Sequence, residues 1–600
     1  MNSAGTENEV ASVYSARLTA RRAKQEAAER RHKQLGYLKL VVVGATILLL
    51  VMGLRAHIAW AWWLIVAIVA LAFLEKAHER VLASLKKCTR VMAFYERGLA
   101  RMEDRWMGGG ETGGDFLKPE HPYARDLDLF GQGSLFELLC TARTSAGKNI
   151  LAEWLMGAAA VPEIERRQEA IRELAPRLDF REEVAASGED IRSRARMEAL
   201  LAWAEVPPVL HPQALRVFAL ILSAGWLLSL LVWAVWGLWE VTLVTSIANR
   251  LFYSHFQSRC QKIIVAETFV REFALLPILL TRMEQENFTS AKLVELQTRL
   301  RQHGVSPAAS IGKLRRLTQA LESRRSLLIA VSDSFVLWTT QVAFAIETWR
   351  QEFASAFRVW LMAVGEMEAL NALANYCYER PEDVFPQFLT EPATSTLEAR
   401  GLAHPLLPRS RATRNDVQLG AELRVMIVSG PNMSGKSTFI RAIGLNGVLA
   451  QCGAPVCAKQ LRLSPLQVTA SICILDSLQG GVSRFYAEIK RLKLIAELAQ
   501  QRAAVLFLLD ELLSGTNSDD RRVGSEAFVK SMVARGAIGL VTTHDLALTR
   551  MTDELPIHAA NFHFEDRIEN GELRFNYQLV AGVAQSSNAL KLMRSIGLEV

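Results

Sequence analysis

The pattern of hydrophobic positions begins with a polar, charged segment, residues 1–36, followed by an uncharged apolar island. Residues 40–54 carry no charge, Arg55 follows, and residues 56–74 are again uncharged. Neither run has the polar face that a surface helix of a soluble protein needs. Apolar runs of this kind are typical of membrane-spanning helices. The sequence therefore predicts a transmembrane helical hairpin at residues 37–75.

A second apolar island follows after a long helical interval. It is uncharged from Val217 to Trp239, meets Glu240, and stays apolar to Ile247. Its length alone fits one crossing of a membrane or a tight pair of crossings.

The remaining pattern separates a helical part of the chain from a C-terminal part with strand-like runs. Residues 76–213 and 251–390 are predicted to be helical regions, the second containing long amphipathic runs. Five prolines between residues 381 and 408 mark a boundary. We therefore expect an all-α region carrying the hairpins and, at residues 391–600, an α/β domain.

The most specific local pattern is GPNMSGKST at residues 430–438. It matches the phosphate-binding pattern G-x-x-x-x-G-K-[ST], with an apolar strand-like run before it and a helix-like run after it. Backbone N–H groups of such a loop bind phosphate oxygens at a helix N-terminus, and its glycines permit close approach. Lys436 is predicted to neutralise the β and γ phosphates of ATP, and Ser437 to coordinate Mg²⁺. The predicted nucleotide-binding residues are Gly430, Pro431, Asn432, Met433, Ser434, Gly435, Lys436, Ser437 and Thr438.

Two further apolar runs end in side chains that suit the same chemistry. Residues 503–509 lead to Asp510, a predicted Mg²⁺ ligand, and to Glu511, predicted to orient or deprotonate the attacking water. Residues 537–541 lead to His544, predicted to sense the γ phosphate. Together with Lys436, these groups predict an ATPase, and no small-molecule substrate beyond ATP is expected.

The charges that flank the apolar islands give a topology. Basic residues lie on both sides of the first island, so both flanks are expected to face the cytoplasm. One crossing at the second island would then place the nucleotide site outside the cell, where ATP is scarce. We therefore expect a second, tight hairpin at residues 214–250, with Glu240 at its turn or against the partner helix. The expected location is a bacterial inner membrane, multi-pass, with the ATPase domain cytoplasmic.

Composition adds little to this picture. Lys and Arg total 69 against 62 Asp and Glu, and the resulting net charge of +7 is too small to indicate nucleic acid by itself. The seven cysteines include no CxxC pair, so they predict reduced thiols rather than a zinc site. The first 36 residues contain no apolar segment of the kind found in a cleavable signal.

The ordered motifs resemble those of the MutS ATPases of DNA mismatch repair. GPNMSGKST is similar to the Walker A motif of that family, DELLSGTNSDD at residues 510–520 to its next acidic segment, and THD at 543–545 to its TH pair. Residues 404–405, 415–416 and 582–586 are similar to further landmarks of the family. The resemblance implies a C-terminal ABC/MutS-type P-loop ATPase domain that uses ATP and Mg²⁺.

The same resemblance implies a homodimer. SRFYAE at residues 483–488 is similar to the family segment that reaches the γ phosphate of the neighbouring subunit, which implies a nucleotide-binding role for Ser483 in the partner's site. Asp520 is implied at the dimer interface. Upstream, residues 127–200 resemble the start of the MutS core domain, and residues 366–378 resemble the helix that returns to the ATPase domain.

The chain also departs from the family pattern. The mismatch-reading domain of the family, with its Phe-x-Glu wedge, has no counterpart before residue 127, and FYE at 94–96 lies in a charged helical stretch that we interpret as unrelated to mismatch reading. Leu513, Ser514 and Arg521 replace residues that the family usually has as Gly, Arg and Gly.

Two hypotheses about function stay open at this point. In the first, a membrane-anchored MutS-like dimer uses ATP to act on mismatched or otherwise distorted DNA in repair. In the second, a membrane-associated dimeric ATPase motor acts on a membrane or protein partner without DNA.

Overall fold

The computed structural model describes residues 3–53, 61–186, 197–207, 212–263, 267–302, 304–322, 327–389, 395–431, 434–472, 484–501, 504–545, 547–554, 558–569 and 572–583. The chain forms two compact units. The first contains Met1–Thr141, Leu151–Leu178 and Leu370–Val600, and the second contains Ala142–Ile150 and Asp179–Ala369. The expectation of a helical N-terminal part and an α/β C-terminal domain is confirmed.

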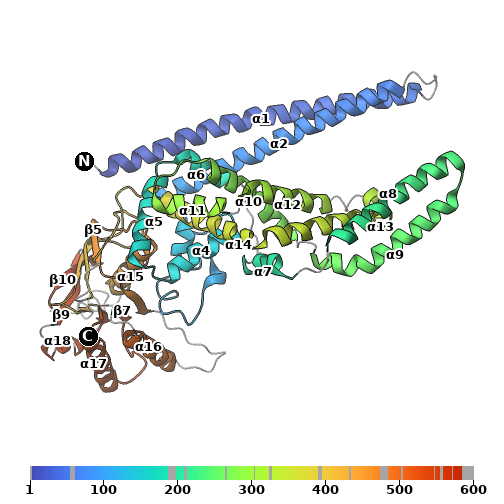
Figure 1. The fold of residues 1–600 in the computed structure, drawn as a ribbon. Helices are drawn as coiled ribbons and strands as arrows, with labels where there is room; N and C mark the ends of the chain where they lie inside the picture. Colours follow the sequence, from blue (N-terminus) through green and yellow to red (C-terminus); the bar gives the residue numbers. More distant parts are fainter. Residues whose placement is uncertain are drawn as a thin grey trace. The chain divides into compact units, whose positions relative to one another are not determined.

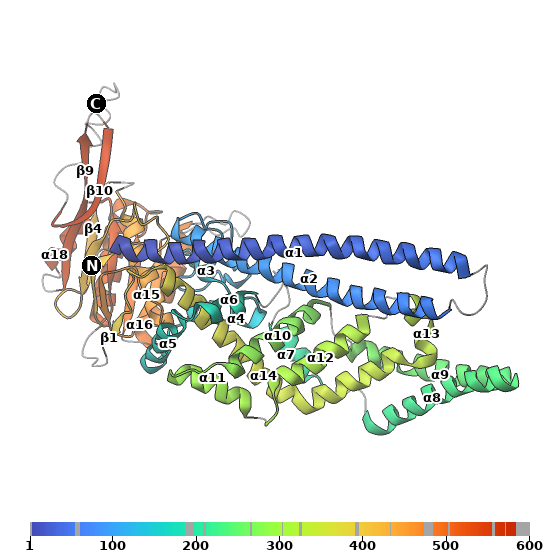
Figure 2. The same cartoon turned by 90° about the horizontal axis from the view of Figure 1, so that it is seen from above.

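The first unit begins with a long antiparallel pair of helices, α1 (Ser3–Gly53) and α2 (Ala61–Met102), which lie side by side in both views (Figures 1 and 2). The pair is packed where the start of α1 meets the end of α2. There the ring of Tyr14 lies 5.3 Å from that of Tyr95 and stacks 5.8 Å from that of Tyr378. Gly98 is required there, because a Cβ at this position would lie 2.4 Å from the Tyr14 ring.

The distal part of the same helix pair has no core. None of residues 19–48 of α1 or 66–87 of α2 is buried. Large apolar side chains are exposed instead, among them Tyr37, Leu40 and Phe73. The first predicted hairpin falls on this distal part and on residues 54–60, which lie outside the described residues.

The C-terminal part of the first unit is built on a six-stranded sheet with the order β10-β9-β4-β8-β7-β6. Neighbouring strands are parallel except for the pair β9 and β10. The strands are β4 (Val425–Ser429), β6 (Gln467–Ser471), β7 (Val505–Asp510), β8 (Ile538–Thr543), β9 (Ala559–Glu569) and β10 (Glu572–Ala581). A smaller sheet, of order β1-β5-β2-β3, comprises β1 (Gln387–Phe388), β2 (Leu397–Leu402), β3 (Asn415–Leu419) and β5 (Gln460–Leu463).

Side-chain alternation along β7 distributes the helices over the two faces of the large sheet. Phe507 and Leu509 belong to one buried cluster with residues of α16 (Arg484–Gln501) and α17 (Ser518–Ala534). Leu508 points to the opposite face, where it contacts Gly444 of α15 (Lys436–Cys452). The central strands are apolar on both faces, as buried parallel strands must be.

The other helices of the first unit lie mainly between the hairpin and the sheets in sequence. They include α3 (Leu135–Leu139), α5 (Val161–Leu174), α18 (Met551–Glu554) and the 3-10 segments Gly114–Phe116 and Leu548–Arg550. Residues before α3 pack on the C-terminal α/β domain: the backbone N–H of Ile472 donates to Asp126 at 2.8 Å, and Leu127 contacts Gly444.

The second unit is helical. It contains α6 (Leu178–Ala186), α7 (Met197–Glu205), α8 (Pro212–Trp236), α9 (Trp239–Ile263), α10 (Glu267–Gln285), α11 (Ala291–Arg301), α12 (Pro307–Glu322), α13 (Leu327–Val336), most of α14 (Trp338–Glu379) and the start of α4 (Ser145–Met156). Its buried Glu368 accepts hydrogen bonds from the backbone N–H groups of Arg143 (2.8 Å) and Thr144, next to the first turn of α4. Desolvation raises the pKa of this carboxyl, and the hydrogen bonds from Thr144 and Arg143 oppose that rise.

The second apolar island forms two helices, α8 and α9, joined by a tight turn in which Gly237 has a φ of 74°. Polar side chains connect the helices: Trp226 Nε1 donates to Ser246 Oγ at 2.9 Å, and Thr242 Oγ1 donates to the Ser229 carbonyl at 3.0 Å. Glu240 lies exposed in the first turn of α9, beside the turn as expected. Among the described residues, one helical segment, Ala214–Trp236, is long and apolar enough to cross a membrane by length and composition.

Candidate nucleotide-binding site

The predicted phosphate-binding loop connects the central strand β4 to helix α15. β4 pairs in parallel with β8 on one side and β9 on the other, and β7 pairs in parallel with β8. The register places Ser429 beside Thr543, and Asp510 beside Thr542. The carboxyl ends of these strands therefore meet at one edge, which is where open parallel sheets bind their ligands.

The loop has the backbone conformation that phosphate binding requires. Gly430 has a φ of 150° and Gly435 a φ of 98°, values that side chains rarely tolerate. A Cβ at Gly430 would also lie 3.0 Å from Ser434 Oγ and 3.2 Å from the Phe564 carbonyl oxygen. Ser434 Oγ is buried and makes no hydrogen bond to any described residue, so this loop retains an unused polar atom.

Lys436 is folded back onto the loop. Its Nζ donates to the carbonyl oxygens of Gly430 and Pro431, both at 2.9 Å. Burial lowers the pKa of this ammonium, while the nearby carboxylates of Glu511 and Asp510 oppose that shift. An anion bound by the loop would compensate the same desolvation, so the residue fits a phosphate ligand.

The second predicted motif lies at the end of β7. Thr542 Oγ1 donates to Asp510 Oδ1, and the backbone N–H of Glu511 donates to the Thr542 carbonyl at 3.2 Å. Glu511 has a φ of 50°, in the left-handed region, so the chain turns sharply at the end of the strand. His544 Nδ1 lies 3.3 Å from Glu511 Oε1.

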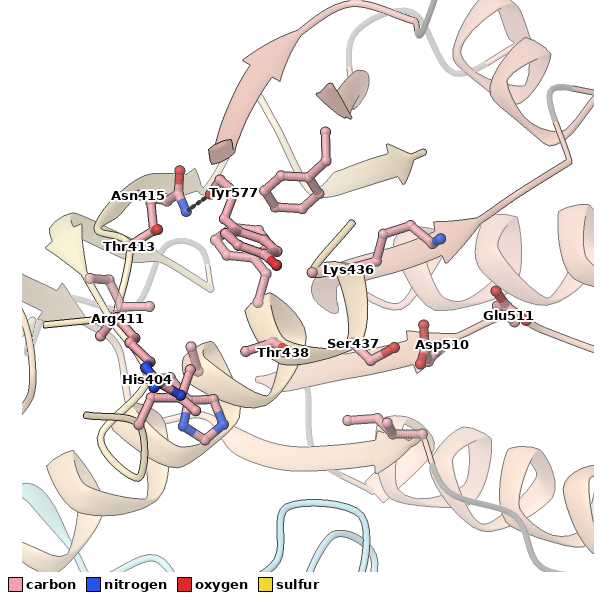
Figure 3. Close-up of a pocket in the computed structure, with 18 residues that line it drawn as sticks. His404, Arg411, Thr413, Asn415, Lys436, Ser437, Thr438, Asp510, Glu511 and Tyr577 are labelled. Atoms are coloured by element: carbon pink, nitrogen blue, oxygen red, sulfur yellow. Dashed lines mark hydrogen bonds between the residues drawn. The ribbon is translucent and has the colours of Figure 1, made fainter. Parts of the chain in front are cut away.

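Six of the predicted residues line one cavity of about 820 Å³, within the size range of small-molecule sites. Its lining includes Lys436, Ser437, Asp510 and Glu511, as Figure 3 shows. Ser437 and Thr438 are exposed at the start of α15. The N–H groups at a helix N-terminus favour the binding of an anion. His544 reaches the site through Glu511.

The donor set fits Mg²⁺ held together with a nucleotide. Among the residues that the structure describes, no three His, Cys, Asp or Glu side chains are grouped as a metal cage. Mg²⁺ usually binds through one or two protein oxygens, with water and substrate phosphates completing its shell. The Ser437 hydroxyl and the Asp510 carboxylate supply such oxygens beside the loop.

Sequence reasoning missed Tyr577 and Arg411, which also line the cavity. Tyr577 has a φ of 54° at an irregularity in β10, and its ring lies against Gly435, where a Cβ would be 2.9 Å from it. Asn415 holds this irregular segment: its Nδ2 donates to the Tyr577 carbonyl at 3.0 Å and its Oδ1 accepts from the Leu579 N–H at 2.8 Å. Asn415, one of the residues noted in the sequence as a family landmark, thus holds a segment more than 150 positions away.

Several predicted residues lie away from the cavity or outside the residues that the structure describes. Asn432, Met433 and Ser483 lie outside the described residues. Glu488, in the segment compared with the family's trans-acting motif, is buried and accepts from the Leu513 N–H at 2.6 Å, so it braces the loop after Glu511. Asp520 is exposed in the first turn of α17, where Asn517 donates to it.

Arg521, one of the departures from the family pattern, contacts the loop that follows Glu511. Its Nη2 lies 3.4 Å from the Ser514 carbonyl oxygen and 3.3 Å from that of Thr516. The guanidinium therefore ties down the segment that follows Glu511.

His404, which lines the cavity, is expected to make the stability of the protein depend on pH. Burial of the imidazole, with a smaller contribution from Arg441, lowers its pKa from 6.5 to about 4. Because the folded protein excludes a proton that the unfolded chain accepts, stability is expected to fall as the pH drops from about 6.5 to about 4, by up to about 3 kcal/mol.

The comparison that isolates this contribution uses His404→Asn. Asn does not titrate, and its side-chain oxygen can replace Nδ1 as acceptor for the Leu406 N–H (3.3 Å). Thermal midpoints of the two proteins measured between pH 7.5 and pH 4 are expected to converge as the pH falls. Parallel curves over that range would show that His404 titrates normally.

These features define a class of protein: a P-loop nucleotide-binding domain of the α/β type, with the loop, the acidic strand end and the adjacent histidine in one place. Residues 426–599 match the family model described as MutS domain V. The C-terminal domain of the chain is thus similar to MutS domain V.

Similar proteins agree with this family. The chain is 29% identical over 290 residues to the "DNA mismatch repair protein MutS" of Geobacillus thermodenitrificans (47% of this chain, 31% of that protein). It is 34% identical over 203 residues to the "Endonuclease MutS2" of Thermus thermophilus (32% and 25%) and 32% identical over 240 residues to the MutS protein of Thermotoga neapolitana (39% and 29%). The chain thus spans between a quarter and a third of the length of these relatives.

Proposed function

We propose that this protein is a MutS-like ATPase that binds ATP with Mg²⁺ and hydrolyses it as a homodimer. The observation that carries the proposal is the convergence of Lys436, Ser437, Asp510 and Glu511 on one cavity beside a glycine-rich loop. Bound Mg²⁺ supplies positive charge to the phosphate oxygens. Lys436 exchanges its loop carbonyls for phosphate oxygens, and Glu511 orients a water and accepts its proton, while His544 holds the Glu511 carboxylate.

Family similarity supports a role on DNA. Relatives named as DNA mismatch repair proteins match 290 and 240 residues of this chain, and residues 426–599, which carry part of the cavity, match MutS domain V. We therefore place the ATPase in the handling of mismatched or otherwise distorted DNA. The test compares the ATPase rate of the full chain in nanodiscs without DNA and with homoduplex, mismatched and branched DNA. Stimulation that weakens as salt is raised supports this role, and an unchanged rate with no salt-dependent binding removes it.

A specific set of contacts favours a second candidate, a motor that acts on a membrane or protein partner without DNA. Arg101, at the end of α2, forms a buried pair with Glu379 at 2.6 Å. Asp104, just beyond α2, accepts from the Arg409 N–H at 3.2 Å, two residues before the cavity residue Arg411. A residue just beyond α2 is thus hydrogen-bonded to the segment that carries a cavity residue. Nucleotide-dependent change in a spin-label distance along the hairpin, without any DNA effect, would select this candidate.

Both candidates include anchoring in a bacterial inner membrane with the ATPase domain in the cytoplasm. Its support is the exposed apolar surface on the distal part of α1–α2 and on α8–α9. The uncharged stretch of α8, about 20 residues, measures roughly 30 Å, which equals the hydrocarbon thickness of a bilayer. Retention in membranes after alkaline carbonate washing tests the anchoring. Release of the full chain into the supernatant would refute it.

Tyr577 is expected to stack against the base of the bound nucleotide. Its ring lies on the loop at Gly435, and the residue is 43% exposed and lines the cavity, so it can contact a ligand there. Stacking of a base on an aromatic ring contributes about 1–3 kcal/mol. Tyr577→Ala should therefore weaken ATP binding about tenfold or more in calorimetry, whereas Tyr577→Phe should bind nearly as well as the wild type. Equal affinities for the Ala variant and the wild type would place the base elsewhere.

A further inference from the structure

The positive charge of the chain is concentrated on one part of the α1–α2 pair. Residues 17–33 and 76–97 contain 13 Lys and Arg and 4 Glu, an excess of 9, which exceeds the net charge of +7 of the whole chain. The rest of the protein is therefore slightly acidic. A cationic stripe of this density attracts an anionic partner.

This stripe encloses a hollow between the two helices, called here the basic groove. The groove has a volume of about 530 Å³ and lies in the part of the pair that has almost no buried core. Part of its lining is small and apolar, made by Ala27, Ala28, Val81, Cys88 and Val91, with Ser84 beside them. Its remaining lining is cationic: Arg21, Lys24, Arg31, Arg80 and Lys87.

The cations of the groove face each other across the helix pair. The rings of His32 and His78 lie 4.6 Å apart and set the register. In this register Arg31 is level with Arg80, and Lys24 is level with Lys87. Like charges placed opposite one another destabilise a helix pair unless an anion lies between them.

The four cations of these two levels are not neutralised by the protein. Lys24, Arg31, Arg80 and Lys87 form no ion pair with any residue that the structure describes. Cations on either side of the groove do: Arg22 pairs with Glu96 at 3.0 Å, and Lys39 pairs with Glu75 at 2.5 Å. Glu26, Glu29 and Glu79 lie near these two levels, but the structure shows no ion pair between them and the four cations.

The groove lies about two helical turns from exposed apolar side chains of the same helices. Arg31 is six residues from the exposed Tyr37, about 9 Å along the helix, and Arg80 is seven residues from the exposed Phe73. A lipid headgroup layer extends roughly 5–7 Å beyond the hydrocarbon, and an arginine side chain covers the remaining distance. The nearer end of the groove is therefore within reach of lipid headgroups.

We propose that the basic groove binds the phosphate of an anionic phospholipid headgroup between Arg31 and Arg80, with Lys24 and Lys87 attracting further anionic lipid. The inference rests on the membrane anchoring proposed above. The apolar part of the lining favours an amphiphile over duplex DNA, because the DNA surface presents phosphates without an apolar chain. Each Lys or Arg close to an anionic membrane surface adds to the attraction. In this proposal the apolar surface inserts into the membrane, and the groove selects anionic lipids.

The test measures lipid binding to the full chain in a mild detergent. Phosphatidylglycerol and phosphatidylcholine with matched acyl chains compete at equal concentration, and native mass spectrometry counts the bound molecules. The groove variant is K24Q/R31Q/R80Q/K87Q. The control variant, R30Q/K33Q/K76Q/K86Q, removes the same number of charges from the same helices outside the groove.

The wild type and the control variant are expected to bind phosphatidylglycerol preferentially, and the groove variant to lose at least tenfold of this binding. Equal losses in both variants, or equal binding of the two lipids, would overturn the proposal. So would inorganic phosphate or a duplex DNA oligonucleotide that displaces the lipid at equal concentration. Removal of facing like charges should not unfold the hairpin, and unchanged ATP binding checks this. Carbonate washing of each variant reports on anchoring separately, so failure of the groove and failure of the anchor are distinguished.

Discussion

Lys436→Ala is expected to reduce ATP affinity at least a hundredfold. The Lys436 ammonium is buried in the loop and bonded to two carbonyl oxygens, so it is placed where β and γ phosphate oxygens would be received. A charge-assisted contact to phosphate in such a setting contributes about 1.5–3 kcal/mol, and Lys436 is expected to make more than one. Isothermal calorimetry with a slowly hydrolysed ATP analogue measures the loss.

The matched control for this substitution is Lys530→Ala. Lys530 forms a surface pair with Glu526 at 2.6 Å on α17, away from the cavity, and exposed pairs of this kind contribute about 0.3–0.5 kcal/mol. Its removal should leave ATP affinity within about twofold of the wild type. If Lys436→Ala binds ATP as well as Lys530→Ala does, the loop is not the phosphate site.

Glu511→Gln is expected to bind ATP normally and to lower turnover at least a hundredfold. The amide keeps the size of the side chain, and the bond from the backbone N–H of Glu511 to Thr542 is untouched. It cannot accept a proton from the attacking water, so binding and hydrolysis separate. Phosphate release under saturating ATP measures turnover, and gel filtration with ATP tests whether the variant accumulates as a closed dimer.

Glu497→Gln on α16 serves as the control for Glu511→Gln. Glu497 pairs with Lys493 at 3.7 Å on an exposed surface and has no contact with the cavity. Wild-type turnover is expected for Glu497→Gln. Wild-type turnover in Glu511→Gln as well would assign the proton transfer to another group.

The sequence contained enough information to predict the parts of the site that follow regular elements directly. Gly430 and Lys436 lie between a strand and a helix, and Asp510 and Glu511 lie at the end of an apolar strand. Parallel strands place these ends at one edge, so spacing along the chain translated into proximity. The helical character of the N-terminal part followed from periodicity in the same way.

The parts that sequence could not reveal depend on contacts between distant residues. Tyr577 reaches the loop only because β10 is irregular there, and a local pattern does not predict which strand carries such an irregularity. Glu488 lies in the segment compared with the family's trans-acting motif, and its bond to the Leu513 N–H depends on how α16 packs on the sheet. The basic groove required the register of α1 against α2, which fixes which charges face one another.

The account depends most on the claim that the cavity at residues 430–438 binds and hydrolyses ATP. The most direct measurement is the rate of phosphate release by the purified full chain in nanodiscs, with Mg²⁺ and with excess chelator, in the wild type and in Lys436→Ala. The account predicts turnover in the wild type that requires Mg²⁺ and is absent in Lys436→Ala. A folded wild-type protein that neither binds nor hydrolyses ATP, or hydrolysis that persists in Lys436→Ala, would contradict it.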